Sequence, residues 1–462
     1  MSSAGISFGG LASGLDTKAI ISALVSIEER PINALTRKKA SFTKQKSLFA
    51  DMKGLLDKLT TAAKALKSTT DFLQMKAKSD DEDVLLATAS SSATPGTYSV
   101  RVTSLAKAQV NSSTGSASAT GSLGGPASLQ LDVGGQSFLI SVANPSLQTI
   151  ASSINDFDTA NSTGVRAEVV DTGNTANGGA NRYQLVVRST KTGTEGAFTL
   201  AYDDGDAAFQ SVINNVAANT SAATNATLLL NGVTTITRSS NQISDLFPGI
   251  TLDLRSVPNP NKDITVTVTT DAEATGKKVQ DFVDAYNKVV DFFTEQNALD
   301  SEGKAKSQLF GDQTLRSMRS SLRTVVGGSV SGTGNEAYQL LSQLGITADT
   351  AGKLTVNKSK LETALADDET AVAAMFTQAG VGIAGRMIDQ IDVYTDSVEG
   401  LLKSRNDTFD RQVKDTQTRI EQGERRLKLY EQQLVVKYSN LESLLSRLQS
   451  QGSSLGNINR LR

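Results

Sequence analysis

The feature that most constrains this chain is an aliphatic residue at every seventh position near its C-terminal end. The row consists of Val413, Ile420, Leu427, Leu434, Leu441 and Leu448. A strict seven-residue step over this length is typical of a coiled coil or a helix bundle, not of a lone surface helix. An interleaved row is less regular and consists of Phe409, Thr416, Gly423, Tyr430, Lys437 and Leu444. We expect Gly423 and Lys437 to weaken the seam locally.

A second helical region opens the chain with the segment SGLDTKAIISALVSIEERP, residues 13–31. Ser13 or Asp16 can cap its first turn, and Pro31 predicts a break between a first helix and a longer one. The longer helix places at its a and d positions Leu35, Lys38, Phe42, Gln45, Phe49, Met52, Leu56, Leu59, Ala63 and Leu66. Both ends of the chain therefore predict long amphipathic helices.

Neither helical arm can bury its own apolar seam. One buried aliphatic side chain stabilises by roughly 1.5–3 kcal/mol, whereas ordering the backbone costs roughly 1–2 kcal/mol per residue. The apolar seams can be buried in two ways: the arms pair with each other within one chain, or they pack against other copies of the chain. We expect an assembly interface at Leu15, Ile20, Leu24, Ile27, Leu35, Phe42, Phe49, Leu56, Val413, Ile420, Leu427, Leu434, Leu441, Leu444 and Leu448.

Composition argues against several function classes. The chain has no His, Cys or Trp, which removes the commonest general base, the commonest nucleophile and nearly all zinc ligation. Residues 1–78 carry 13 Lys or Arg against 6 Asp or Glu. These cations do not form the dense basic face with interleaved aromatics that nucleic-acid binding requires. We expect no nucleic-acid partner, no membrane span and no cleaved secretion signal.

Four short motifs favour structural roles over chemistry. The acidic run Asp203, Asp204 and Asp206 lacks a carboxylate at the twelfth loop position, where Asn214 stands, so we interpret it as a charged turn. The acidic run at 80–83 keeps a linker solvated. The glycine-rich stretch 327–335 lacks the ending of a phosphate loop, and Ala12 stands where a nucleophile elbow needs serine. We expect neither an enzyme nor a bound cofactor or metal.

Composition changes twice along the chain, and the pattern predicts an α+β multidomain fold. A helical coiled-coil or bundle stalk is built from both chain ends, with two β-rich head domains, one inserted within the other. The expected parts are a helical N-terminus at 1–40 that is disordered until assembled, a stalk helix at 41–77, an inner β head at 78–127 with 226–271, an outer β head at 128–225, a stalk helical domain with a small β-hairpin at 272–430, and a coiled-coil C-terminus at 431–462.

Turn signals and alternation place the strands of the heads. Asn231-Gly232 predicts a hairpin turn, and Pro248-Gly249 predicts a second turn. The expected strands lie at 98–102, 138–142, 165–170, 183–188, 198–201, 250–254 and 264–268. After the heads we expect a helix with the face Val279, Phe282, Val283, Tyr286, Val289, Val290 and Phe293, and then a hairpin leading into a helix that Ser359 caps together with Glu362.

Several segments resemble the bacterial flagellar filament cap family, also called hook-associated protein 2. They are GLASGLDTKAIISALVSIEERPINAL, PGTYSVRVTSLAKAQ, LLLNGVTTITRSSNQISDLFPGITLDL, DFVDAYNKVVDFF and GKLTVNKSKLETALADDETAVAAMF, and they occur in the family's order over most of the chain. The stretch at about 128–225 carries no motif of the family. The resemblance implies a closed homo-oligomeric ring at the distal tip of the extracellular flagellum, with the β heads forming a plate and the helical legs reaching onto the filament.

The resemblance also implies partners. They are other copies of the chain, flagellin, the hook–filament junction proteins, and the flagellar type III export machinery with an export chaperone. The implied role is to promote flagellin insertion and folding and to prevent flagellin leakage. Two alternatives rest on composition and on the terminal arms: a surface adhesin or glycan-binding role of the heads, whose loops are rich in Ser, Thr and Asn, and a structural subunit of the filament junction.

Overall fold

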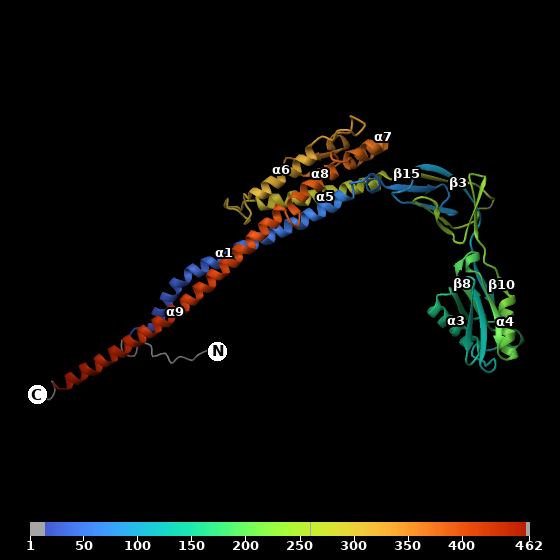
Figure 1. The fold of residues 1–462 in the computed structure, drawn as a ribbon, viewed down its shortest axis with the longest axis horizontal. Coiled ribbons are helices and arrows are strands. Elements are labelled where there is room, and N and C mark those ends of the chain that lie inside the picture. The colour runs from blue at the N-terminus through green and yellow to red at the C-terminus, as the bar shows by residue number, and fades with distance from the viewer. Residues whose placement is uncertain (1–13, 259, 459–462) are drawn as a thin grey trace. The chain divides into compact units, whose positions relative to one another are not determined.

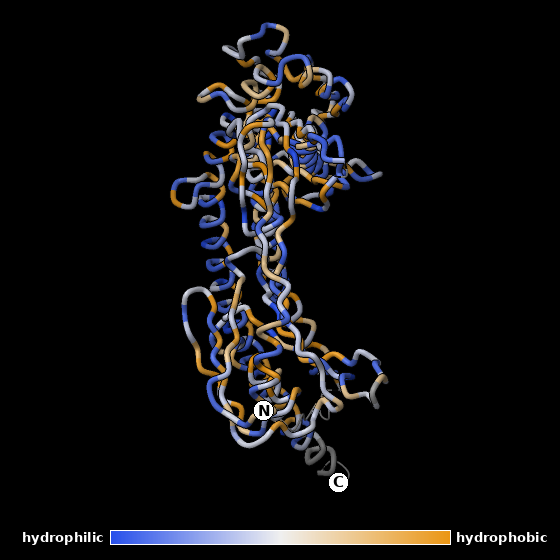
Figure 2. The backbone as a smooth tube through the Cα atoms, turned by 90° about the vertical axis from the view of Figure 1, so that its right-hand side faces the viewer, coloured by the Kyte–Doolittle hydropathy of each residue, from blue (hydrophilic) through white to orange (hydrophobic). Residues whose placement is uncertain are grey.

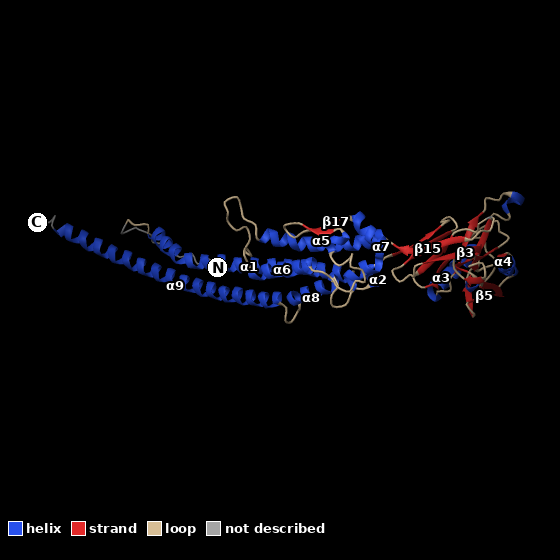
Figure 3. Cartoon of the chain, turned by 90° about the horizontal axis from the view of Figure 1, so that it is seen from above, coloured by secondary structure: helices blue, strands red, loops and turns tan. Residues whose placement is uncertain are grey.

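The chain folds into two compact units. The computed structural model describes residues 14–258 and 260–458. One unit combines the two chain ends, Met1–Phe72 and Glu273–Arg462, and the other is Leu73–Ala272. Figure 3 shows that the unit built from the chain ends is mostly helical, whereas the strands lie mainly in the other unit. The expected fold class, a helical stalk from both ends with β-rich heads inserted, is confirmed.

The helical unit pairs two long helices and adds a smaller bundle. Its helices are α1 (Thr17–Lys64), α2 (Thr69–Phe72), α5 (Ala272–Gln296), α6 (Gln313–Gly327), α7 (Lys358–Thr377), α8 (Ile383–Thr395) and α9 (Leu401–Ile458), with a 3₁₀ turn η3 (Leu341–Leu344). The predicted hairpin forms as β16 (Ile346–Ala348) paired with β17 (Leu354–Val356). In Figure 1, α1 and α9 run side by side.

The α5 helix buries the face that its sequence spacing predicts. All seven of its predicted apolar residues are buried. Tyr286 is among them, and burial raises the pKa of its phenol to about 12. The rings of Phe72 and Phe376 stack at 5.0 Å and join α2 to α7. These contacts form a core for the bundle that α5 through α8 contribute to.

The cap of α7 differs from the prediction. Ser359 was expected to cap this helix together with Glu362, but the cap is Asn357, two residues earlier, and the helix begins at Lys358. The Asn357 side chain accepts a hydrogen bond from the Lys360 backbone N–H at 3.0 Å. Asparagine caps as well as serine does, and Asn357 is the residue on which the β16–β17 hairpin ends, so the chain turns into the helix there.

We expect Asn357→Ala to lower the free energy of unfolding of the helical unit by about 1 kcal/mol, because one backbone donor loses its acceptor. Ser359→Ala is the matched control and should be close to neutral, since this residue lies inside the first turn. Urea unfolding followed by circular dichroism measures both. A larger loss for Ser359→Ala would contradict the assignment of Asn357 as the cap.

The unit Leu73–Ala272 contains two separate apolar cores. We call the part around one core the inner head. It has a five-stranded antiparallel sheet in the order β1 (Met75–Ser79), β15 (Ile264–Thr270), β3 (Gly96–Ser104), β11 (Ala226–Leu230) and β12 (Thr234–Arg238), and a three-stranded sheet in the order β13 (Gln242–Phe247), β14 (Ile250–Leu254) and β2 (Leu85–Ala89).

The turns of the inner head follow the sequence signals. Asn231 and Gly232 both have positive φ, 51° and 70°, as a tight hairpin turn between β11 and β12 requires. Gly249 has φ +73° before β14. The alternating residues Val266 and Val268 of β15 point into the core, as predicted.

We call the part around the other core the outer head. Its sheets have the orders β10 (Thr220–Ser221), β4 (Ala108–Ser112), β8 (Tyr183–Thr192), β7 (Val165–Asp171), and β6 (Gln136–Val142), β5 (Ala127–Val133), β9 (Phe198–Asp204). Two helices, α3 (Leu147–Asn161) and α4 (Ala207–Ala218), and two 3₁₀ turns, η1 (Ala176–Gly179) and η2 (Thr194–Gly196), complete it. The prediction of a β domain therefore missed α3 and α4.

The capping box of α3 is a local signal that could have revealed this helix. Ser146 and Thr149 satisfy each other's backbone N–H groups. Leu147, Ile150 and Ile154 then follow at helical spacing and are buried.

Among the helices of the described residues, none is both long and apolar enough to cross a membrane. The tube in Figure 2 changes repeatedly between hydrophilic blue and hydrophobic orange along the chain.

Candidate functional site: the paired terminal helices

An aromatic cluster joins the two terminal helices. The ring of Phe409 on α9 lies 5.8 Å from that of Phe49 and 6.5 Å from that of Phe42, both on α1. The Arg405 guanidinium lies 6.0 Å from the centre of the Phe49 ring and is also paired with Asp312 at 3.1 Å. The arms thus pair within one chain, which is one of the two kinds of cover left open by the sequence.

Polar pairs flank this cluster. Lys39 Nζ donates to Gln417 Oε1 at 2.6 Å, and Lys46 forms an ion pair with Asp410. The Lys46 and Asp410 side chains are 40% and 56% exposed, so their pair contributes little to stability. The apolar contacts therefore hold α1 and α9 together, while the polar pairs align them.

The predicted break at Pro31 is wrong, because α1 continues through this residue from Thr17 to Lys64. Pro31 removes one backbone hydrogen bond from the helix. The next residue, Ile32, is 8% exposed and packs where α9 carries Gly423. Packing against a partner helix at this point offsets the lost hydrogen bond, since tertiary contacts supply most of the stability of a helix in a protein.

Gly423, which was expected to weaken the seam, lies where Ile32 of α1 packs against α9. A Cβ atom at this position would lie 2.9 Å from Cγ1 of Ile32, closer than side-chain atoms approach each other. The missing side chain is therefore what lets α1 and α9 approach at this level. Helix propensity is a weak guide where a neighbouring helix needs the space.

We expect Gly423→Val to cost about 1–3 kcal/mol of unfolding free energy, because the added methyl groups overpack the contact with Ile32. Gly54→Val is the matched control. Gly54 lies in α1 with no atom within 4 Å of its missing Cβ, so the same change there should be neutral or slightly stabilising. Urea unfolding of both variants measures the difference. Equal stabilities would show that the contact at Gly423 is dispensable.

The predicted interface residues divide into three groups by exposure. Those fully or nearly buried within the single chain are Phe49, Leu56, Ile420 and Leu434. Those half-buried are Ile20, Leu24, Leu35, Phe42, Val413 and Leu427. Those exposed are Leu15, Ile27, Leu441, Leu444 and Leu448. The single chain already covers the first group, so the exposed residues are the candidates for contact with another molecule.

The exposed apolar residues concentrate on the last part of α9. Leu441, Leu444 and Leu448 are 42%, 59% and 53% exposed. Three further residues there were not predicted from the heptad rows, because they lie outside both: Leu429, Val435 and Val436, which are 58%, 50% and 59% exposed. The sequence signal for these three residues was a local excess of aliphatic residues rather than a seven-residue period. Exposed aliphatic side chains gathered on one part of a helix are typical of a protein-interaction surface, and this part of α9 is the candidate for one.

At the other end of the seam, Asp16 is the cap of α1, as predicted. Its carboxylate accepts a hydrogen bond from the Ala19 backbone N–H at 2.9 Å. The alternative cap, Ser13, lies outside the described residues. The expected boundaries at residues 40 and 430 fall inside α1 and α9, so dependence of the chain ends on assembly stays a prediction.

The acidic runs of the heads serve local structure. Asp206 accepts a hydrogen bond from the Gly125 backbone N–H at 2.6 Å, and Asp203 accepts one from Ser128 at 2.5 Å. Asp81 pairs with Lys262 at 2.5 Å, and this hydrogen bond lowers the pKa of the Asp81 carboxyl. Within the described residues, no group of Asp and Glu side chains gathers as a metal site would.

Comparison with known proteins agrees with the resemblance. The family profile described as the C-terminus of flagellar hook-associated protein 2 matches residues 223–450, and the one for its N-terminus matches residues 13–109. The flagellar hook-associated protein 2 of Escherichia coli K12 is 31% identical, over 98% of this chain and 97% of that protein. This chain belongs to the flagellar hook-associated protein 2 family. The B-type flagellar hook-associated protein 2 of Pseudomonas aeruginosa PAO1 is 28% identical over 98% of this chain and 97% of that protein.

Solved structures of flagellar hook-associated protein 2 relatives support the fold. The crystal structure of the D1-D2-D3 domains of the flagellar cap protein FliD from E. coli matches with a TM-score of 0.61 and 30% identity, over 79% of this chain and 99% of that one. The hook-associated protein 2 family is one of structural flagellar cap proteins and is not a known enzyme family. The paired terminal helices are thus the candidate assembly surface of a flagellar cap protein.

Proposed function

We propose that this chain caps the flagellar filament. Several copies form a closed ring at the distal, extracellular tip, promote the insertion and folding of flagellin and prevent flagellin from leaking away. The observation that carries the proposal is the exposed apolar surface of α9 at Leu441, Leu444 and Leu448 in a member of the cap family. One chain does not bury this surface, so a second copy or a filament subunit is the natural cover.

The paired arms suggest how such a cap stays attached while the filament grows. The aromatic cluster at Phe409 is internal to one chain, so a leg keeps its own structure when its outer contacts change. The outer contacts are then made by several modest apolar side chains, such as Leu441, Leu444 and Leu448, together with exposed polar side chains. Many replaceable contacts suit stepwise movement better than one deep anchor does.

The proposal includes the partners that such a role needs. They are flagellin, the hook–filament junction proteins on which the first cap forms, and the type III export machinery with a chaperone that keeps the subunit unfolded for passage. The chain holds no cysteine, so no disulfide has to form after export.

Electron microscopy of filament tips tests the proposal. Filaments from a strain that lacks this chain are compared with filaments from the same strain carrying it again, and flagellin monomer in the medium is measured in parallel. We expect a plate at the distal tip and little free flagellin only when the chain is present. Bare tips in both strains, or unchanged flagellin in the medium, would refute the proposal.

A further inference from the structure

Two short chain segments form the covalent neck between the inner and outer heads. They are the segments 105–108 and 221–226. Lys107 and Thr224 exchange backbone hydrogen bonds of 2.8 and 3.1 Å across this neck. Domains joined by so small a connection move relative to each other by default. An additional contact is therefore needed if the outer head is to keep one orientation.

The turn after β8 supplies such a contact. Thr192 Oγ1 donates a hydrogen bond of 2.7 Å to the carbonyl oxygen of Ser239, in the inner head between β12 and β13. The Thr194 backbone N–H donates one of 2.7 Å to Oδ1 of Asn225, the residue before β11. The turn Thr192–Gly196 thus reaches from the outer head to Asn225 of the neck and to Ser239 of the inner head.

Gly193 lies at the centre of this contact. Its φ is +77°, in the left-handed region, and a Cβ atom there would lie 2.4 Å from Cα and 2.5 Å from the carbonyl oxygen of Ser239. Those are backbone atoms that cannot rotate away. No side chain of any size fits between the two heads at this position without separating them.

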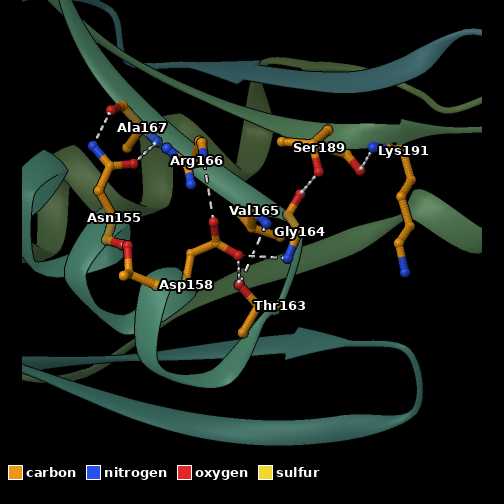
Figure 4. Close-up of polar contacts among 11 residues, drawn as sticks. Asn155, Asp158, Thr163, Gly164, Val165, Arg166, Ala167, Ser189 and Lys191 are labelled. Carbon is orange, nitrogen blue, oxygen red and sulfur yellow. Dashed lines mark hydrogen bonds and ion pairs between the residues drawn. The ribbon is translucent and has the colours of Figure 1, made fainter. Parts of the chain in front are cut away.

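The outer head braces the base of the turn. The Asp158 carboxylate, 8% exposed at the end of α3, accepts hydrogen bonds from the Gly164 N–H at 2.6 Å and from Thr163 Oγ1 at 3.0 Å, and pairs with Arg166 at 3.1 Å. The Gly164 carbonyl in turn accepts hydrogen bonds from both the backbone N–H and the hydroxyl of Thr190. Figure 4 shows this network beside Ser189 and Lys191, where β8 leads into the turn.

We propose that the turn Thr192–Gly196 is a latch that locks the outer head in one orientation on the inner head, and that Gly193 is the residue that lets it close. The hydrogen bond from Thr192 to Ser239 attaches the outer head to the inner head at a second place beside the neck, and the bond to Asn225 holds the turn against the neck. A second attachment restricts the hinge motion that the neck alone would allow.

The absence of cysteine makes the test direct, because two introduced cysteines are the only labelling sites. Thr235→Cys in β12 and Glu168→Cys in β7 are both exposed positions, one in each head. Spin labels on them report the distance distribution between the heads by pulsed electron spin resonance. Gly193→Ala is compared in this background with Gly135→Ala, a glycine of the same φ, +77°, with no atom within 4 Å of its missing Cβ.

We expect a single narrow distance peak in the parent and in Gly135→Ala, and a distribution at least about twofold wider in Gly193→Ala, because the hinge is restored. Equal widths for both glycine variants would overturn the latch. A broad peak in the parent would overturn it too, since the heads would then move despite the contact.

A second variant covers the case in which Gly193→Ala disturbs the outer head itself. Asn225→Ala removes only the acceptor for Thr194 and leaves the turn backbone free of strain. Hydrogen exchange at the buried core residues Ile150 and Leu185 reports whether the outer head remains folded. If this protection is lost in Gly193→Ala, the result for Asn225→Ala is decisive. A wider distance distribution between the spin labels, with core protection intact, supports the latch. An unchanged distance distribution overturns it.

Discussion

Replacing Leu441, Leu444 and Leu448 together by aspartate is expected to abolish cap assembly and to leave the monomer folded. All three side chains are exposed in the single chain, so surface substitutions there should change the free energy of unfolding by no more than about 0.5 kcal/mol. Burial of one leucine stabilises a contact by roughly 1.5–3 kcal/mol, so losing three weakens association by at least about a thousandfold.

Swimming motility and electron microscopy of filament tips read out assembly, while circular dichroism of the purified monomer reads out folding. The matched control is Leu139→Asp, a leucine of the outer head that is 58% exposed and lies far from the terminal helices in the sequence. It should leave tips and swimming normal. Capped filaments in the triple variant would mean that the end of α9 contacts no other molecule. An unfolded monomer would contradict the exposure of these leucines.

Phe409→Ala is expected to cost about 3–5 kcal/mol of unfolding free energy, the usual penalty for emptying an aromatic site in a core. Phe409 is 7% exposed and is the ring that Phe42 and Phe49 share, so its removal opens a cavity between α1 and α9. We expect faster hydrogen exchange along both helices and no change in the heads.

Phe310→Ala serves as the control, because this phenylalanine of the same unit is 46% exposed. It should cost well under half as much as Phe409→Ala, since most of its surface already meets water. Urea unfolding separates the two. If the two variants lost equal stability, the pairing of α1 with α9 would not be held by the aromatic cluster.

The sequence predicted most of the fold where one strong local signal coincided with the final packing. The seven-residue step of α9, the face of α5 and the Asn231-Gly232 turn are such cases, since the periodicity or the backbone requirement belongs to the element itself. The helices α3 and α4 were missed because they sit among strands in a segment rich in Ser, Gly, Ala and Asn, where composition favours loops and strand edges.

The wrong break at Pro31 and the expected weak point at Gly423 share one cause. Each residue disfavours a helix when its own segment is considered alone. In the folded chain the two lie near the same contact, which joins α1 to α9 across nearly the whole sequence at Ile32. No local pattern reveals that the missing side chain of Gly423 makes room for Ile32, the residue that follows Pro31. For the same reason, periodicity found the candidate assembly residues but could not tell the buried Phe49 from the exposed Leu444.

The contact between Ile32 and Gly423 also affects how α1 and α9 align along their length. Sliding α9 by one heptad in either direction would bring Thr416 or Tyr430 opposite Ile32, where a side chain would crowd the Ile32 side chain. The contact therefore favours one alignment of α1 with α9. A fixed alignment also fixes the level of the exposed Leu441, Leu444 and Leu448 on α9 relative to α1.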